Sequence, residues 1–202
     1  STTSSSAELH SVASSRSGQG SSMGQIRLPQ PVKLIVPMLA HDTERFADAD
    51  RALCERLVAI DWRSELLPFE ATEYYVAEMG TPQWRRFVTL AELVDPGELA
   101  QIKIATNDIE QELSLEGRRQ VNLDPGYVSL AKLVLATTKN QWHRLYIGQG
   151  IYAEVTLSYQ RGAWRPQPWT YPDYATPAYL AIMAGVRERY QAQLREFTRR
   201  SG

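Results

Sequence analysis

The chain has one cysteine, no long apolar run and almost no net charge, and each of these absences excludes a class of protein. Cys54 is the sole cysteine among 202 residues, so no disulfide can form within the chain and a reducing cytoplasm is the expected setting. A formal net charge of -1 supplies no broad field that would attract nucleic acid. The most apolar early run, residues 32–40, is much shorter than the roughly 20 residues of a membrane helix. We therefore expect no membrane span and no nucleic-acid partner.

Several motifs that would reveal a reaction are also missing. Neither the P-loop pattern G-x-x-x-x-G-K-[ST] nor the dinucleotide pattern G-x-G-x-x-G occurs in the sequence. Histidine is scarce as well, and with one cysteine the chain has too few ligands for a standard zinc motif. We predict no metal site, and the sequence leaves open both a cofactor and whether the protein is an enzyme.

The composition divides the chain into two parts. Residues 1–25 are rich in Ser, Gly and Thr and have too few apolar side chains to offset the entropy of ordering, so we expect a disordered tail. Residues 26–202 have the composition of an ordinary globular protein and a length that suits a single α+β domain.

The apolar pattern predicts the order of the elements. Its period favours a strand at 32–39, a helix at 42–57, strands at 60–69 and 85–94, a helix at 95–113 and a strand at 119–123. This is the ferredoxin-like βαββαβ order, and a β-meander and a C-terminal helix from Pro177 follow it. The alternative, a doubly wound parallel sheet, would need helices where the sequence shows hairpins.

Turn signals organise the second half of the chain. Gln149-Gly150 and Arg161-Gly162 each fit a β-hairpin. Asp124-Pro125-Gly126 is typical of a tight turn. Residues 129–138 fit either a buried strand or a short helix, and the spacing of their leucines favours the helix. In the first predicted helix, we expect Cys54 to pack in the interior.

Polar residues inside apolar segments are the candidates for a binding site. Asn122 and Asp124 flank the Asp-Pro-Gly turn and serve either to stabilise the bend or to contact a ligand from the end of a strand. Thr137, Thr138 and Lys139 combine two hydroxyls with a cation, which suits a phosphate or carboxylate, although an ordinary loop would look the same.

Further polar groups could complete such a site. Lys103 and Glu110 share one face of the helix 95–113, along the edge of its buried stripe, either as a snorkelling lysine paired to the glutamate or as the polar wall of a cleft. Glu154 lies on the polar face of an alternating strand, and His143 could exchange protons near neutral pH. We predict Glu154 and His143 as the catalytic pair of any reaction, although only the fold could bring them together.

Two functional hypotheses follow. In the first, a small anionic or nucleotide-like ligand binds a polar pocket, whose predicted contacts are Asn122, Asp124, Lys132, Thr137, Thr138, Lys139, Lys103 and Glu110. In the second, the chain is a non-enzymatic interaction or assembly domain, with a protein partner or a second copy of itself. Its contacts would be the aromatic and basic stretch from Tyr74 to Arg86, the loop PWTYPDY at 168–174, and the C-terminal helix.

Several longer stretches resemble a known family. They are PVKLIVPML, EYYVAEMG, LVDPGELAQIKIATNDIE, VNLDPGYVSLAKLVLATTK, HRLYIGQGIYAEVTL and WTYPDY. Together they are similar to the bacterial domain-of-unknown-function family 4416, and the resemblance covers Pro31 to Arg195. Some members of that family are labelled GTP-binding protein, whereas this sequence has neither a P-loop nor an N-K-x-D guanine motif.

Overall fold

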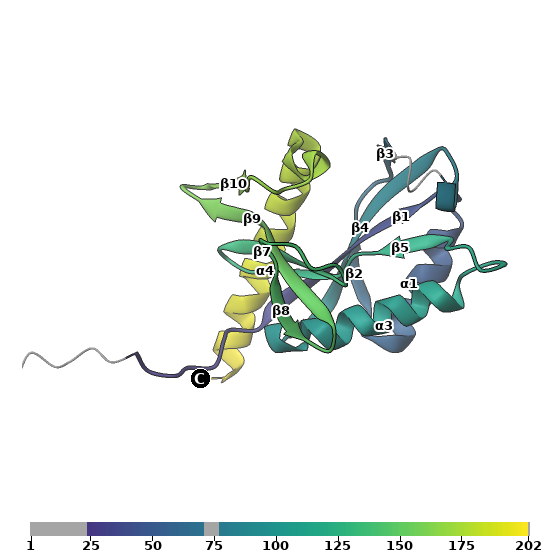
Figure 1. Ribbon diagram of the computed structural model, residues 1–202. Helices are drawn as coiled ribbons and strands as arrows, with labels where there is room; N and C mark the ends of the chain where they lie inside the picture. Colours follow the sequence, from purple (N-terminus) through teal and green to yellow (C-terminus); the bar gives the residue numbers. More distant parts are fainter. Residues whose placement is uncertain (1–23, 71–76, 202) are drawn as a thin grey trace, which may run out of the picture.

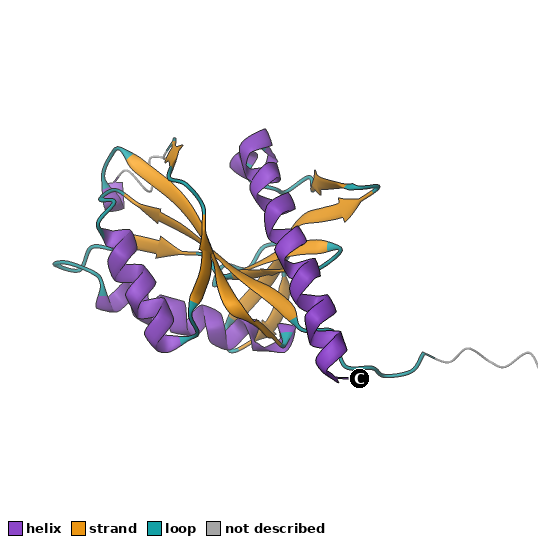
Figure 2. Cartoon of the chain, turned by 180° about the vertical axis from the view of Figure 1, so that it is seen from behind, coloured by secondary structure: helices purple, strands orange, loops and turns teal. Residues whose placement is uncertain are grey.

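The computed structural model describes residues 24–70 and 77–201, which form a ten-stranded antiparallel sheet with helices on both faces (Figures 1 and 2). The strands are β1 (Val32–Ala40), β2 (Ile60–Arg63), β3 (Leu67–Phe69), β4 (Gln83–Val94), β5 (Val121–Leu123), β6 (Gly126–Val128), β7 (Lys132–Thr137), β8 (Leu145–Gly148), β9 (Ile151–Gln160) and β10 (Ala163–Pro166). The helices are α1 (Arg45–Arg56), α3 (Leu99–Glu112) and α4 (Pro177–Ser201), with short 3-10 turns η1 (Pro96–Glu98) and η2 (Pro172–Ala175). The predicted α+β class, antiparallel sheet and C-terminal helix are confirmed.

Strand β1 lies at the centre of the sheet. The main path of strands runs β10-β9-β7-β6-β1-β4-β2, while β3, β5 and β8 pair with β4, β1 and β9 respectively. All nine residues of β1 are buried, because helices cover the sheet on both sides of this strand.

The two faces of the sheet have separate cores. On one face, Val36 and Met38 of β1 pack against Phe46 of α1 and Ile102 and Ile109 of α3. On the other face, α4 crosses the strands (Figure 2), and its contribution to the core consists of Tyr179, Met183 and Val186. In this second core, the α4 residues pack with side chains of β1, β4, β6, β7 and β9. Side chains that alternate along a strand are therefore buried in both directions.

The helix expected at residues 129–138 is wrong, because residues 132–137 form strand β7. This strand pairs with β6 on one side and β9 on the other. Leu133 packs in the layer under α4, whereas Val134 and Ala136 pack against Leu99 and Ala100 at the start of α3. A strand covered on both faces shows an apolar run instead of alternation, and a short run of this kind resembles a buried helix.

Asp124-Pro125-Gly126 does not turn the chain back on itself. Strands β5 and β6 pair with the same edge of β1 in one register, since Met38 faces Leu123 and Ile35 faces Gly126. The amide of Asp124 donates to the carbonyl of Pro37 at 3.0 Å, which keeps the gap between the two strands bonded. Gly126 is required by close approach, because a Cβ there would lie 2.1 Å from the carbonyl oxygen of Val134.

The other turn predictions have mixed outcomes. Gln149-Gly150 connects β8 to β9 and Arg161-Gly162 connects β9 to β10, so both hairpins are confirmed. The single strand expected at 60–69 is two strands, β2 and β3, that both pair with β4. Cys54 is exposed, not packed.

A buried lysine of β1 pairs with an aspartate of β2, the strand on the far side of β4. Lys33 is 0% exposed, and its Nζ donates to Asp61 Oδ2 at 2.5 Å and to the carbonyl of Leu90 at 2.7 Å. The hydroxyl of Thr89 donates to the other oxygen of Asp61 at 2.6 Å. Burial lowers the pKa of Lys33 even though Asp61 favours the charged form.

Two expectations fall on residues that are not described. The predicted tail lies almost wholly within residues 1–23, and Tyr74 and Tyr75 belong to residues 71–76. Across the described ranges, every helix is too short or too polar to cross a membrane.

Candidate functional site

The hydrogen bonds and ion pairs of the structure join the predicted site residues into separate groups. Lys103, Glu110, Asn122 and Asp124 come together where α3 packs on β5. His143 and Glu154 meet on β9 and the loop before β8. The remaining four predicted residues are at the two ends of β7, and they are Lys132, Thr137, Thr138 and Lys139.

The first group, the Asp124 cluster, is centred on the chain that leaves β5. Lys103 is 6% exposed, and its Nζ donates to the carbonyl of Leu123 at 2.8 Å and lies 3.7 Å from Asp124 Oδ1. The amide of Asn122 donates to Asp124 Oδ2 at 2.6 Å. Lys103 thus points into the protein from α3, and its Nζ does not reach out to solvent as a snorkelling lysine would.

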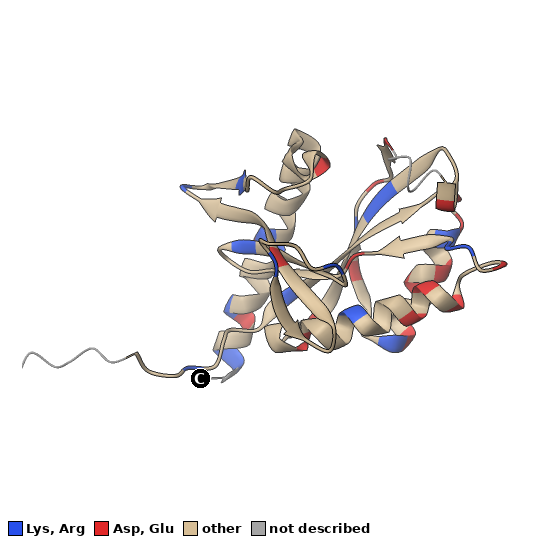
Figure 3. Cartoon of the chain, in the orientation of Figure 1, with Lys and Arg blue, Asp and Glu red and all other residues tan. Residues whose placement is uncertain are grey.

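Two members of the Asp124 cluster were not predicted. Arg119 binds both carboxylate oxygens of Glu78, through Nε at 3.0 Å and Nη2 at 3.2 Å. Its Nη1 donates to Asn122 Oδ1 and lies 3.5 Å from Glu110 Oε2. Figure 3 shows both signs of charge interspersed along α3 and the adjoining strands. Arg119 therefore links the segment before β4 to α3 and β5.

Glu110 has the most unusual ionisation in the cluster. Its Oε1 accepts from the backbone amide of Leu123 at 2.5 Å, and its side chain is 12% exposed. Burial raises the pKa of Glu110 from 4.5 to about 7, although Lys103, the Leu123 amide and Arg119 all favour the carboxylate. The cluster therefore changes its charge near neutral pH.

The charge of Asp124 also affects the ionisation of Arg85, on β4. It is 5% exposed, and its Nη2 donates to Asp173 of η2 at 3.3 Å. Burial lowers the pKa of Arg85, but Tyr174, Tyr179 and the carboxylates of Asp124 and Asp173 outweigh burial and raise it. Burial likewise raises the pKa of Asp173, although Arg85 opposes the shift. Asp124 therefore contributes to the raised pKa of Arg85 and Asp173 as well as to that of Glu110.

Arg85 interacts with Asp173 and Tyr179, and part of its hydrogen-bonding capacity is unused. Its Nε and Nη1 are buried and have no acceptor in the described part of the chain. Its guanidinium lies over the ring of Phe69, with 4.8 Å between Cζ and the ring centroid. Arg85 was among the contacts predicted for an interaction surface, whereas the structure buries it. Arg86 is also turned inward, where it pairs with Asp50.

The second group brings together the two predicted catalytic residues. His143 Nε2 is 2.9 Å from Glu154 Oε2, and because a carboxylate only accepts, this nitrogen carries the proton. Glu154 also accepts from Arg144 Nε at 2.9 Å and from the hydroxyl of Thr156 at 3.3 Å. Three donors satisfy the carboxylate, so Glu154 is suited to orient the imidazole. Nδ1 is the ring nitrogen of His143 that these contacts leave without a partner in the described residues.

Aromatic rings enclose His143. The imidazole stacks on Trp169 with the planes 14° apart and the centroids 5.1 Å apart, and Trp142 meets both rings edge-on. Trp169 Nε1 donates to the carbonyl of Val155, and the hydroxyl of Thr170 donates to the backbone carbonyl of Thr156. These bonds occupy the edge of β9 between the parts that pair with β8 and β10. His143 Nδ1 is buried and has no partner in the region described.

The ends of β7 hold the remaining predicted residues. Thr137 Oγ1 accepts from the amide of Lys139 at 3.2 Å, and the carbonyl of Lys139 accepts from Arg144. Thr138 and Lys139 are exposed. Lys132, at the opposite end, lines a separate hollow of about 370 Å³ beside Tyr190. The structure thus separates Lys132 from the Thr-Thr-Lys turn by the length of the strand.

No group of three or more His, Cys, Asp or Glu side chains among residues 24–70 and 77–201 could hold a metal ion. Comparison with known protein families identifies the family of this chain. The family described as Domain of unknown function (DUF4416) matches residues 30–190. The chain belongs to this family. No curated protein and no solved structure matches the chain.

Proposed function

We propose that the domain binds a small ligand with an anionic group, such as a nucleotide-like molecule, and that Arg85 is its anchor. The observation that carries this proposal is the buried guanidinium of Arg85, which bonds Asp173 at 3.3 Å and interacts with Tyr179 but has two nitrogens, Nε and Nη1, without an acceptor in the described residues.

The energetics of burial favour an added acceptor. An unpartnered buried donor costs about 1–3 kcal/mol, and the cost is larger for a charged group. Folded proteins tolerate such a cost mainly where a ligand or ion completes the hydrogen bonds. A phosphate or carboxylate matches the planar donor array of arginine better than a neutral group does.

The surroundings of Arg85 supply the rest of the recognition. Asp124 and Asp173 keep 33% and 24% of their side chains exposed, so the rim of the site is in contact with solvent. Their oxygens can accept from ligand hydroxyls, as a sugar phosphate would present. Lys103 is a second buried cation, 3.7 Å from Asp124. The proposed site therefore uses three of the predicted ligand contacts, namely Lys103, Asn122 and Asp124.

Titration calorimetry with adenosine monophosphate, inorganic phosphate and adenosine tests the proposal. We expect the two phosphates to bind and adenosine not to bind, and we expect Arg85→Gln to weaken binding at least tenfold. Arg165→Gln removes an exposed arginine of β10 and is the matched control. If Arg85→Gln does not fold, Asp173→Asn tests the rim of the same site. Equal binding by native protein and both variants would refute the proposal.

The Thr137–Lys139 turn is the other predicted anion contact, and one more variant separates the two places. Lys139→Ala leaves the buried site intact, because Lys139 is exposed at the end of β7. Loss of phosphate binding in this variant alone would move the anion site to the turn.

We also propose the pair of His143 and Glu154, which no contact described above joins to Arg85, as the acid–base group of any reaction that the domain catalyses. The 2.9 Å contact supports this role, because Glu154 fixes the imidazole and leaves Nδ1 for proton exchange. Turnover that survives His143→Gln would exclude it.

A second candidate function, protein interaction or self-assembly, has its own supporting observation. Large hydrophobic side chains are exposed in the loop around β8 and before η2: Trp142 at 82%, Leu145 at 73%, Tyr146 at 62% and Tyr171 at 59%. Exposed apolar groups of this kind are typical of contact surfaces. Sedimentation at several concentrations should show association that Trp142→Ser with Tyr146→Ser abolishes, and a strictly monomeric native protein with no partner would exclude this candidate.

We also propose a specific topology for the fold. The order β5-β1-β4-β2, with α1 and α3 on one face, supports a ferredoxin-like βαββαβ unit followed by the meander β7 to β10. The single cysteine supports a cytoplasmic setting.

A further inference from the structure

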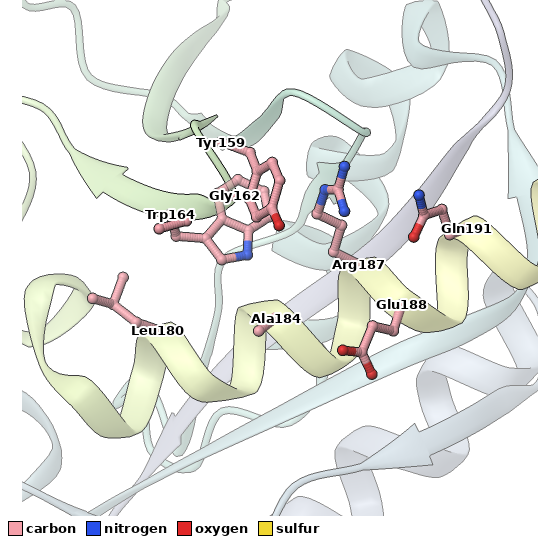
Figure 4. A pocket seen from close by; sticks show the side chains of 9 residues that line it. Tyr159, Gly162, Trp164, Leu180, Ala184, Arg187, Glu188 and Gln191 are labelled. Atoms are coloured by element: carbon pink, nitrogen blue, oxygen red, sulfur yellow. The ribbon is translucent and has the colours of Figure 1, made fainter.

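A hollow of about 500 Å³ lies between the β9–β10 hairpin and α4, apart from the residues of the proposed anion site (Figure 4). Its lining consists of Tyr159, Gly162, Ala163, Trp164, Leu180, Ala184, Arg187, Glu188 and Gln191. This volume is within the range of about 300–1,000 Å³ that small-molecule sites occupy.

The aromatic wall of the hollow contains an unused donor. Trp164 is 5% exposed and meets Tyr159 edge-on, with 5.3 Å between the ring centroids. Its indole nitrogen has no acceptor in the described part of the chain, and Figure 4 shows that nitrogen on the side of the ring toward α4. A buried indole N–H normally has a partner. A ligand in the hollow would provide one.

A fixed cation lies beside this donor. The guanidinium of Arg187 lies over the ring of Tyr159, with 3.7 Å from Cζ to the centroid, and its Nε donates to the carbonyl of Leu130 at 2.9 Å. These two contacts hold the group in place. The terminal nitrogens have no acceptor among the residues that the structure describes, so they remain available to an anion.

The rest of the lining sets the size and charge of the occupant. Leu180 and Ala184 provide an apolar wall on α4, and a Cβ at Gly162 would meet nothing within 4 Å. Glu188 lines the same hollow, and its negative charge disfavours a ligand with two or more charges.

We infer that this hollow binds a small monocarboxylate with an apolar body. One carboxylate oxygen accepts from Trp164 Nε1 and the other from a terminal nitrogen of Arg187, while the apolar part lies against Leu180 and Ala184. The site differs from the one proposed around Arg85, since the two share no residue.

Phenylacetate and its neutral isostere phenylacetamide are the probes, measured by titration calorimetry on the full chain. We expect phenylacetate to bind and phenylacetamide to bind at least tenfold more weakly. Trp164→Phe keeps the ring and removes the N–H, and Arg187→Gln removes the charge. Each should weaken phenylacetate binding about tenfold or more, in line with one lost charge-assisted hydrogen bond.

Two more variants keep the test decisive. Ala184→Phe fills the hollow from an exposed position of α4 and should abolish binding, whereas Arg195→Gln, an exposed arginine about three turns further along the helix, should leave it unchanged. Absence of phenylacetate binding, equal binding of the two probes, or full binding by Ala184→Phe would each overturn the inference. None of these results bears on phosphate binding at Arg85.

Discussion

Replacing Glu110 with glutamine should change how the stability of the protein depends on pH. The pKa of Glu110 is raised from 4.5 to about 7, so between these values the folded chain holds a proton that the unfolded chain has lost. The free energy of unfolding therefore falls as pH rises through this window, and the penalty stays constant above it. The shift corresponds to at most about 3 kcal/mol, and the 12% exposure of the side chain leaves little screening by solvent.

Urea unfolding of native protein and Glu110→Gln at pH values from 4 to 8.5 measures this contribution. Glutamine does not ionise, so the stability of the variant relative to native protein should increase by up to about 3 kcal/mol between pH 4.5 and pH 8. Titrating groups outside the Asp124 cluster contribute equally to both proteins and cancel in the difference. Glu112→Gln, at an exposed position of the same helix, is the control and should show no such trend. A flat difference for Glu110→Gln would refute the account of this cluster.

Three further substitutions probe the packing by thermal or urea unfolding. Asp61→Ala leaves the charge of Lys33 buried without its partner and should cost about 3–5 kcal/mol; a loss below about 1 kcal/mol would show that Lys33 escapes to solvent. Gly126→Ala places a Cβ against the facing carbonyl of β7 and should cost about 1–3 kcal/mol, whereas Gly185→Ala in α4, with open space around it, should be neutral or stabilising. Glu154→Ala removes the acceptor of a buried imidazole and a buried guanidinium and should cost about 3 kcal/mol, so an unchanged melting temperature would contradict the contacts described.

Local chemistry made part of the fold predictable. The Gly-containing pairs Gln149-Gly150 and Arg161-Gly162 set tight hairpins by themselves, since Gln149, Gly150, Arg161 and Gly162 all adopt a positive φ. The course of the chain at Asp124-Pro125 was not predictable in this way. Its straight path depends on pairing with β1, which is about 85 residues earlier in the chain, and turn residues carry no information about such a partner.

The candidate site was predictable only in composition. The helical spacing placed Lys103 and Glu110 on one face of the helix but left open whether that face lines a cleft, and nothing local indicates that Arg119 binds Glu78, 41 residues away. The sequence does contain a pattern that could have identified Arg85. It alternates with Phe87 along β4, so it lies on the same buried face of the strand, and a charged residue on such a face is a candidate ligand contact.

The central claim is that a ligand anion binds the guanidinium of Arg85, and the nitrogen-15 NMR signal of its Nε–H tests this most directly. The signal can be assigned by its disappearance in Arg85→Lys. Addition of adenosine monophosphate should shift it along a saturable curve with the affinity found by calorimetry, while adenosine leaves it in place. A signal that stays fixed while the nucleotide binds, or a protein that binds no phosphate, would contradict the account.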